Sequence, residues 1–263
     1  MSETNRPVLL SIDGPIAEIT LNRPDSLNAV NVEMAVALRD VVAELGERKD
    51  VRVVLLQGAG RVFMAGGDLN YFRAAEDKRA ASDALIQPIH DAVAALSALP
   101  QIVVASLHGA VAGAGMSLAM IADLAVAEQG TVFNMAYAKV GNSPDCSGSW
   151  SLPRIVGLRK ALEIALLSDD LSAEEALRLD LINRVADKGN GGLVAREMAE
   201  RIAAMSPAAM ANIKSLMRRS LDTSLEDQLD AEAKAFADTA CTRDFSEALD
   251  AFFERRKPEF TGS

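Results

Sequence analysis

The sequence has few aromatic residues, few cysteines and no long apolar run. Aromatic residues make up 4% of its 263 residues, so the core of any folded domain must be built mainly from aliphatic side chains. Its two cysteines, Cys146 and Cys241, are far apart and match neither a zinc-binding spacing nor a disulfide framework. The longest apolar runs, residues 102–107 and 110–122, are short or broken by glycine, whereas a membrane-spanning helix needs about 20 apolar residues. The sequence therefore predicts no metal site and no membrane span.

Positive charge is also scarce. The chain has 27 lysines and arginines against 37 acidic residues, which gives a formal net charge of −10. Nucleic-acid binders present a basic face because phosphate neutralisation supplies most of their affinity, so nucleic acid is not an expected partner. Residues 1–7 are polar and contain no apolar core of a secretory signal. Together with the unpaired cysteines, this predicts a cytoplasmic protein.

The apolar residues that are present indicate an α/β body. Residues 8–12 and 16–21 flank an Asp-Gly pair and predict a β-hairpin. Asn31 is a predicted N-cap for a helix that continues to Arg48 with apolar residues at helical spacing. Further strands are predicted at residues 51–56, 102–107 and 123–127, with helices at residues 78–99 and 112–121. Strands separated by helices are typical of an α/β sheet with crossover connections.

The pattern changes in the second half of the chain. After Ser149 nearly all of the sequence is predicted to be helical, and Pro207 is expected to begin one of these helices. Glycines at residues 189–192 mark a candidate linker. We therefore expect two parts, an α/β core over residues 1–190 that binds the ligand and a helical region over residues 191–263 for oligomerisation.

Two glycine-rich segments, residues 63–69 and 108–116, each follow a predicted strand. Small residues let a backbone approach a ligand closely, and a helix N-terminus offers unpaired N–H groups. Two such amides aimed at one carbonyl oxygen would stabilise an enolate or a tetrahedral oxyanion, each contributing roughly 3–4 kcal/mol. Taken singly, each segment is more often an ordinary tight turn. Neither has the spacing of a dinucleotide-binding or triphosphate-binding loop.

Five segments in their order along the chain resemble the enoyl-CoA hydratase/isomerase (crotonase) family. They are residues 22–29, 65–69, 108–123, 171–176 and 253–260. The resemblance implies a crotonase-like spiral of ββα units followed by a C-terminal helical trimerisation region, and a homotrimer or a dimer of trimers. It also implies that the substrate is a coenzyme A thioester, with no permanently bound cofactor and no metal.

The resemblance assigns roles to individual positions. It implies that the backbone N–H groups of Gly67 and Ala114 form the oxyanion hole for the thioester carbonyl. Both contacts come from the backbone, so an alanine at position 114 is compatible with this role. The contacts with adenine and pantetheine map to Ser26, Leu27, Ala29, Ala65, Asp68 and Leu69.

The acids of the hydratases are missing. The positions of their two glutamates fall on Ser117 and Tyr137, which are poor bases at neutral pH. Asp145 stands where the isomerases of the family carry a single acid. One base beside a polarised carbonyl is enough to move a proton from C2 to C4. The resemblance thus implies isomerisation of 3-enoyl-CoA to 2-enoyl-CoA with Asp145 as acid and base, in place of hydration.

A second pattern competes with this interpretation. The 4-chlorobenzoyl-CoA dehalogenases of the family use an aspartate of this loop as nucleophile, a histidine as base and an aromatic residue between them, and Asp145, His90 and Tyr137 match these positions. Against that alternative, Ile89 stands where those enzymes have a tryptophan, and the only tryptophan is Trp150. A third alternative is a CoA-ester-binding protein without catalysis, from which the presence of Asp145 distinguishes an isomerase.

Overall fold

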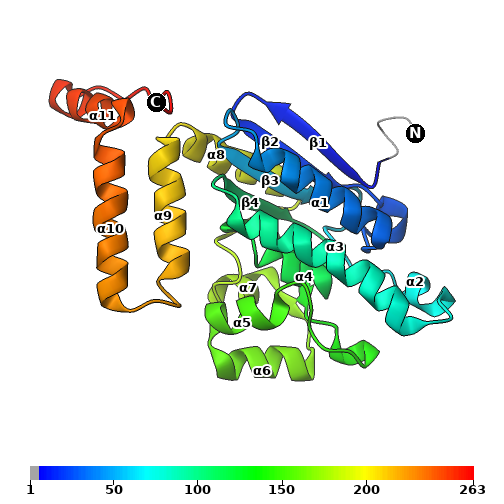
Figure 1. The fold of residues 1–263 in the computed structure, drawn as a ribbon. Helices are drawn as coiled ribbons and strands as arrows, with labels where there is room; N and C mark the ends of the chain where they lie inside the picture. Colours follow the sequence, from blue (N-terminus) through cyan, green and yellow to red (C-terminus); the bar gives the residue numbers. More distant parts are fainter. Residues whose placement is uncertain (1–5) are drawn as a thin grey trace.

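The computed structural model describes residues 6–263 as a sheet body joined to a helical arm (Figure 1). Residues 1–5 lie outside this range. They belong to the polar segment, residues 1–7, on which the expected cytoplasmic location partly rests. The main sheet has six strands, and only its first pair is antiparallel. In spatial order they are β1 (Val8–Asp13), β2 (Ile16–Leu21), β3 (Val53–Gly58), β4 (Ile102–Leu107), β6 (Leu124–Glu128) and β9 (Arg184–Ala186).

The elements predicted in the first half of the chain are confirmed. The hairpin turns at Gly14, whose φ of +56° suits the Asp-Gly pair. Helix α1 (Val32–Gly46) begins after Asn31, whose side chain accepts the backbone N–H of Met34 at 3.0 Å. The predicted helix at residues 78–99 is α3 (Lys78–Ala98).

Helices cover both faces of the sheet. Alternate residues of β3 point to opposite sides: Val54 and Leu56 join the core under α1 and α3, whereas Val53 and Leu55 join a second core under α8 (Gly191–Ala203). Helix α8 thus packs on the sheet, although it lies just beyond residue 190. The division of the chain at that residue stays a prediction.

A smaller sheet and several short helices complete the body. The smaller sheet contains β5 (Ala110–Ala112), β7 (Val132–Asn134) and β8 (Leu171–Ser172). The shorter helical elements are η2 (Pro24–Ser26), α2 (Leu69–Ala74), α4 (Ala114–Ala119), η3 (Ala138–Val140), α5 (Gly148–Val156), α6 (Leu158–Leu167) and α7 (Ala173–Arg178). Strands β8 and β9 interrupt the region after Ser149 that the sequence predicts as almost wholly helical.

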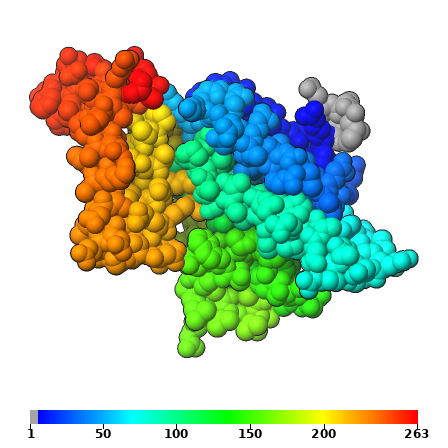
Figure 2. All heavy atoms as spheres, in the orientation of Figure 1, coloured from blue at the N-terminus to red at the C-terminus, as the bar shows by residue number. Residues whose placement is uncertain are grey.

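The arm consists of α9 (Pro207–Arg219), α10 (Leu225–Ala240) and α11 (Arg243–Glu254). As predicted, Pro207 begins a helix. Figure 1 shows α9 and α10 as an antiparallel pair beside the body, with α9 nearer to it, and Figure 2 shows the same yellow and orange segments at one side of the molecule. Among residues 6–263 no helix is long and apolar enough to cross a membrane.

Candidate active site

The two glycine-rich segments lie side by side at the ends of β3 and β4. Three backbone hydrogen bonds join them: Phe63 N–H to His108 O at 2.8 Å, Met64 N–H to Ala110 O at 3.2 Å, and Ala112 N–H to Met64 O at 3.0 Å. Parallel strands end at the same edge of a sheet, so the loops that follow them meet there. The structure therefore brings together two segments that the sequence predicts only separately.

The two segments also meet at Gly66 and Gly113. Both have positive φ angles, +109° and +51°, which favour glycine. A Cβ atom added to Gly113 would lie 3.6 Å from the Cα of Gly66, and one added to Gly66 would lie 3.3 Å from Ala112 O and 3.8 Å from Ala114 N. The two glycines thus set the loops at contact distance, immediately before Gly67 and Ala114.

The amides of Gly67 and Ala114 are left without an internal acceptor. Val30 bonds to the residues on either side of Gly67, through Val30 N–H to Gly66 O at 2.8 Å and Asp68 N–H to Val30 O at 2.9 Å. Ala114 is the first residue of α4, where the N–H has no partner within the helix. Within residues 6–263, neither amide donates to a protein acceptor. Two free amides on touching loops can hold an oxygen atom that carries negative charge.

The predicted CoA-binding residues also gather around these loops. Ala65 N–H donates to Leu27 O at 3.0 Å, which joins the 65–69 segment to the turn after η2. Leu69 is exposed. The Asp68 carboxylate is already engaged, because it pairs with Arg23 at 3.0 Å and accepts the N–H of Asn70 at 3.1 Å to cap α2.

Sequence reasoning missed the residue that holds this turn in place. Asn28 is fully buried and has a φ of +53°, and its amide nitrogen donates to the carbonyls of Ala59, Val62 and Phe63 at 2.9–3.0 Å. Its side-chain oxygen accepts the N–H of Arg23 at 2.8 Å. Asparagine tolerates the left-handed region and bonds to nearby backbone, which was the available signal.

On the other side of the site, Ser117, Tyr137 and Asp145 form one chain of hydrogen bonds. The Tyr137 hydroxyl donates to the Asp145 carboxylate, and the Ser117 hydroxyl lies 3.1 Å from Tyr137 Oη. Burial, followed by the negative charge of Asp145, raises the pKa of Tyr137, so this residue stays a protonated donor. Ser117 lies on α4, whose first residue is Ala114. The two positions that carry acids in hydratases therefore hold hydroxyl groups that lead to Asp145.

His90 and Cys146 adjoin Asp145. The Cys146 N–H donates to His90 Nε2 at 3.3 Å, and the possible metal-ligand atoms of His90, Asp145 and Cys146 lie within 4.8 Å of one another. Cys146 and Ser147 both have positive φ angles, +49° and +77°. For residues other than glycine this conformation carries strain, and such strain is concentrated at functional sites. The predicted site residues His90 and Asp145 are thus neighbours in the structure.

A small cavity of about 210 Å³ lies beside this cluster, and His90, Ser147 and Trp150 contribute to its lining. The sequence argument against a dehalogenase relied on the lack of a tryptophan next to His90 in the chain. In the fold Trp150 lines the same cavity as His90. That argument is therefore weaker than the sequence suggested.

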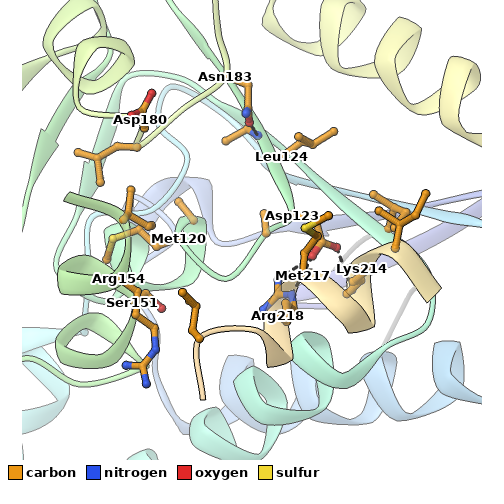
Figure 3. A pocket seen from close by; sticks show the side chains of 18 of the residues that line it. Met120, Asp123, Leu124, Ser151, Arg154, Asp180, Asn183, Lys214, Met217 and Arg218 are labelled. Carbon is orange, nitrogen blue, oxygen red and sulfur yellow. Dashed lines mark hydrogen bonds and ion pairs between the residues drawn. The ribbon is translucent and has the colours of Figure 1, made fainter. Parts of the chain in front are cut away.

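A larger cavity of about 590 Å³ separates the body from α9 (Figure 3). None of the predicted site residues lines it, and it shares Trp150 with the small cavity. At its edge the buried Lys214 and the half-buried Arg218 of α9 pair with Asp123 at 2.8 and 2.7 Å. Burial lowers the pKa of Lys214, although the charge of Asp123 opposes this shift. These ion pairs attach the arm to the body.

Comparison with known proteins fits this geometry. Residues 11–263 match the model of the enoyl-CoA hydratase/isomerase family. The chain belongs to that family. It has the crotonase fold and acts, like the family, on CoA thioesters. A relative in Escherichia coli K12, a 1,2-epoxyphenylacetyl-CoA isomerase, is 34% identical to it, and the match covers 97% of this chain and 98% of the relative.

Other relatives carry different names. A trans-2-decenoyl-[acyl-carrier-protein] isomerase of Streptococcus mutans is 29% identical, with 98% of each chain covered. The crystal structure of an enoyl-CoA hydratase from Polaromonas sp. JS666 superposes with a TM-score of 0.92 at 32% identity, covering 97% of this chain and 99% of the other. The family thus includes hydratases and isomerases among the relatives of this chain, and membership alone does not choose between the two reactions.

Proposed function

We propose that this protein converts 3-enoyl-CoA thioesters into 2-enoyl-CoA thioesters, with Asp145 as the single acid and base. The observation that carries the proposal is the hydrogen-bond chain from Ser117 through Tyr137 to Asp145. Hydration requires acids that position and activate a water molecule, and these two positions hold hydroxyl groups. A proton shift requires one base that can reach two carbons, and Asp145 is the carboxylate that this chain of hydroxyls orients.

In the proposed reaction the Asp145 carboxylate removes a proton from C2 of the acyl group. The electrons of the C2–H bond move into the C1–C2 bond, and the thioester oxygen takes up negative charge beside the N–H groups of Gly67 and Ala114. The resulting dienolate then takes the proton back from Asp145 at C4, and the double bond settles between C2 and C3. Donors that are already oriented toward the oxygen stabilise this intermediate without reorganisation.

The names of two relatives support an isomerase. One is a 1,2-epoxyphenylacetyl-CoA isomerase and another is a trans-2-decenoyl-[acyl-carrier-protein] isomerase. In the proposal for this chain, the CoA portion lies along Ser26, Leu27, Ala29, Ala65, Asp68 and Leu69. The proton balances between substrate and Asp145, so the reaction as written needs no permanently bound cofactor.

The surroundings of Asp145 favour a second candidate, hydrolytic removal of the halogen from a halogenated aromatic acyl-CoA with Asp145 as nucleophile. His90 lies next to Asp145, and Trp150 gives the adjoining cavity an aromatic wall. The hydrogen bond from the Cys146 N–H to His90 Nε2 works against this candidate, because it occupies the lone pair that a base needs to accept a proton from water.

The substrate distinguishes the candidates. The purified protein is incubated with 3-hexenoyl-CoA and, separately, with 4-chlorobenzoyl-CoA. Conjugation of the first without chloride release from the second is the expected result. If the wild type releases chloride and His90→Gln abolishes that release, the dehalogenase proposal is correct and the isomerase proposal is wrong. Binding of both thioesters without turnover would leave a CoA-ester-binding protein.

We also propose that the arm mediates assembly into a homotrimer or a dimer of trimers. Its helices expose many apolar side chains, which monomeric proteins rarely leave in contact with water. They include Ile213, Met217, Leu221, Leu225, Leu229, Phe236, Phe252 and Phe253. Light scattering at micromolar concentration tests this, and a stable monomer would contradict it.

A further inference from the structure

We propose that His90, Asp145 and Cys146 form a binding site for one divalent transition-metal ion of the zinc class, and that a metal ion held there blocks the active site. The possible ligand atoms of all three residues lie within 4.8 Å of one another. Cysteine spacing in the sequence gives no sign of this site, because the histidine comes from α3 and the other two ligands from the turn before α5.

The turn explains how neighbouring residues contribute to one site. Side chains of consecutive residues in an extended chain point in opposite directions. At Cys146 the backbone has a φ of +49°, followed by +77° at Ser147, and this left-handed turn lets the Asp145 carboxylate and the Cys146 thiol approach the same point. His90 Nε2 accepts the Cys146 N–H at 3.3 Å, which places the ring at this turn, and this hydrogen bond must break when the Nε2 lone pair binds an ion.

The distances are close to those that a metal ion requires. Ligands at about 2.0 Å for nitrogen and 2.3 Å for sulfur in a tetrahedral site lie about 3.5 Å apart. The three groups must therefore close by about 1 Å from their present outer limit of 4.8 Å. His90 is exposed, so its ring has room to turn and an ion can enter from solvent.

The ligand set selects the class of metal. One imidazole nitrogen, one thiolate and one carboxylate suit Zn²⁺ or Co²⁺, whereas Mg²⁺ and Ca²⁺ prefer oxygen ligands only. A thiolate and a carboxylate balance the charge of a divalent ion, and water fills a fourth position. Burial, followed by the charge of Asp145, raises the pKa of the Cys146 thiol, so the ion must displace the thiol proton, which is released to solvent.

The inhibitory half of this inference rests on the proposed function, but the binding half does not. A metal ion bound to the Asp145 carboxylate occupies the electron pair that would accept the C2 proton. Binding can be measured without any substrate, so a failure of the metal site and a failure of the isomerase proposal give different results.

The chain supplies its own control variants, because it has two histidines and two cysteines. Cys241 is exposed and belongs to the arm, and His108 Nε2 already bonds to Gly60 O at 3.0 Å. The matched pairs are therefore Cys146→Ser with Cys241→Ser, and His90→Gln with His108→Gln. Cys146→Ala is added because a serine oxygen can still bind metal.

The full-length protein is titrated with Co²⁺, and the cobalt–thiolate absorption band is recorded. We expect the band to saturate at one ion per chain, to disappear in Cys146→Ser and Cys146→Ala, and to persist in Cys241→Ser. His90→Gln should weaken Co²⁺ binding at least tenfold, since even residues around the ligands commonly change affinity by about 10–100-fold, and His108→Gln should not. A band lost only with Cys241, or one that never saturates, would overturn the metal site.

Competition with Zn²⁺ tests the inhibitory half. One equivalent of Zn²⁺ should remove the cobalt band from the Co²⁺-loaded protein. Added to metal-free wild type, it should stop conversion of 3-hexenoyl-CoA, and a chelator should restore conversion. If Zn²⁺ displaces Co²⁺ while conversion continues, the inhibitory half is wrong. A saturable band in a protein that converts no 3-enoyl-CoA would uphold the metal site and contradict the proposed function.

Discussion

The two sides of the candidate site are built in different ways. The side of Gly67 and Ala114 consists of backbone amides at the ends of β3 and β4, and its geometry depends on strand pairing and on two contacting glycines. The side of Asp145 consists of side chains that come from α3, α4 and the 136–148 segment. The fold itself fixes the first side, whereas single substitutions can change the chemistry of the second. A family can thus keep thioester binding while its reactions differ.

The largest effect is expected on the side-chain side. Asp145→Asn keeps the size of the residue and removes the base, so conversion of 3-enoyl-CoA should fall by about 10³-fold, within the range of general-base contributions. Binding of a CoA thioester, followed by calorimetry, should persist because the amides of Gly67 and Ala114 are unchanged. A variant that loses binding together with turnover would show that the two sides are not separable.

The backbone side is tested by removing one donor at a time. Gly67→Pro and Ala114→Pro each delete an N–H, and each should reduce kcat by about 100-fold, the effect typical for one oxyanion donor. Proline is well tolerated at the first position of a helix, which is where Ala114 lies. Ala114→Pro is therefore the cleaner of the two, and thermal unfolding controls for damage to the Gly67 loop. Full activity in a folded Ala114→Pro protein would remove this amide from the oxyanion hole.

A smaller fall in kcat is expected when a side chain that orients Asp145 is changed. Tyr137→Phe removes the hydroxyl that donates to Asp145. Hydrogen bonds to charged groups contribute about 1.5–3 kcal/mol, so kcat should fall roughly tenfold or more with KM nearly unchanged.

Loss of stability is the competing explanation for such a result. Tyr137→Phe also leaves the buried Ser117 hydroxyl without its partner. The double variant Ser117→Ala with Tyr137→Phe removes both polar groups, so it should regain thermal stability without regaining activity. If the double variant regains activity together with thermal stability, Tyr137 supports only the fold.

The smallest effect is expected for Ala114→Gly. The donor at this position is the backbone N–H, so kcat should stay within about twofold of the wild type. Glycine in a helix costs roughly 0.5–1 kcal/mol relative to alanine, which a thermal melt can detect. A large fall in kcat with an unchanged melting temperature would show that the side chain matters on what we describe as the backbone side.

Local signals predict the elements that carry the backbone side, whereas the roles of Gly67 and Ala114 are implied by resemblance and the contact between their loops is visible only in the structure. The Asp-Gly turn, the Asn31 cap and the glycine segments each act over a few residues, and the structure confirms the hairpin, α1 and the placement of both loops after strands. The short strands β5, β7, β8 and β9 were missed, because two or three residues carry no measurable periodicity and their pairing partners are distant in the chain.

The side-chain side could be predicted only in part. Asp145 and His90 were found by resemblance, but their contact with Cys146 was not, because no rule on cysteine spacing includes a histidine from another helix. Nor does any local signal predict a left-handed Cys146, since the residue is neither glycine nor asparagine. Trp150 is 60 positions from His90 in the sequence, and only the folded chain brings the two residues to the same cavity.

The central claim is that one carboxylate moves one proton from C2 to C4. It is tested most directly with 3-hexenoyl-CoA that carries deuterium at both C2 positions, in ordinary water, with the label in the 2-hexenoyl-CoA product located by NMR. Our account predicts that wild-type protein places part of the deuterium at C4, because Asp145 returns the atom that it removed before exchange with water is complete, and that Asp145→Asn yields almost no product. Conjugation that leaves only solvent hydrogen at C4, or that proceeds equally well in Asp145→Asn, would contradict it.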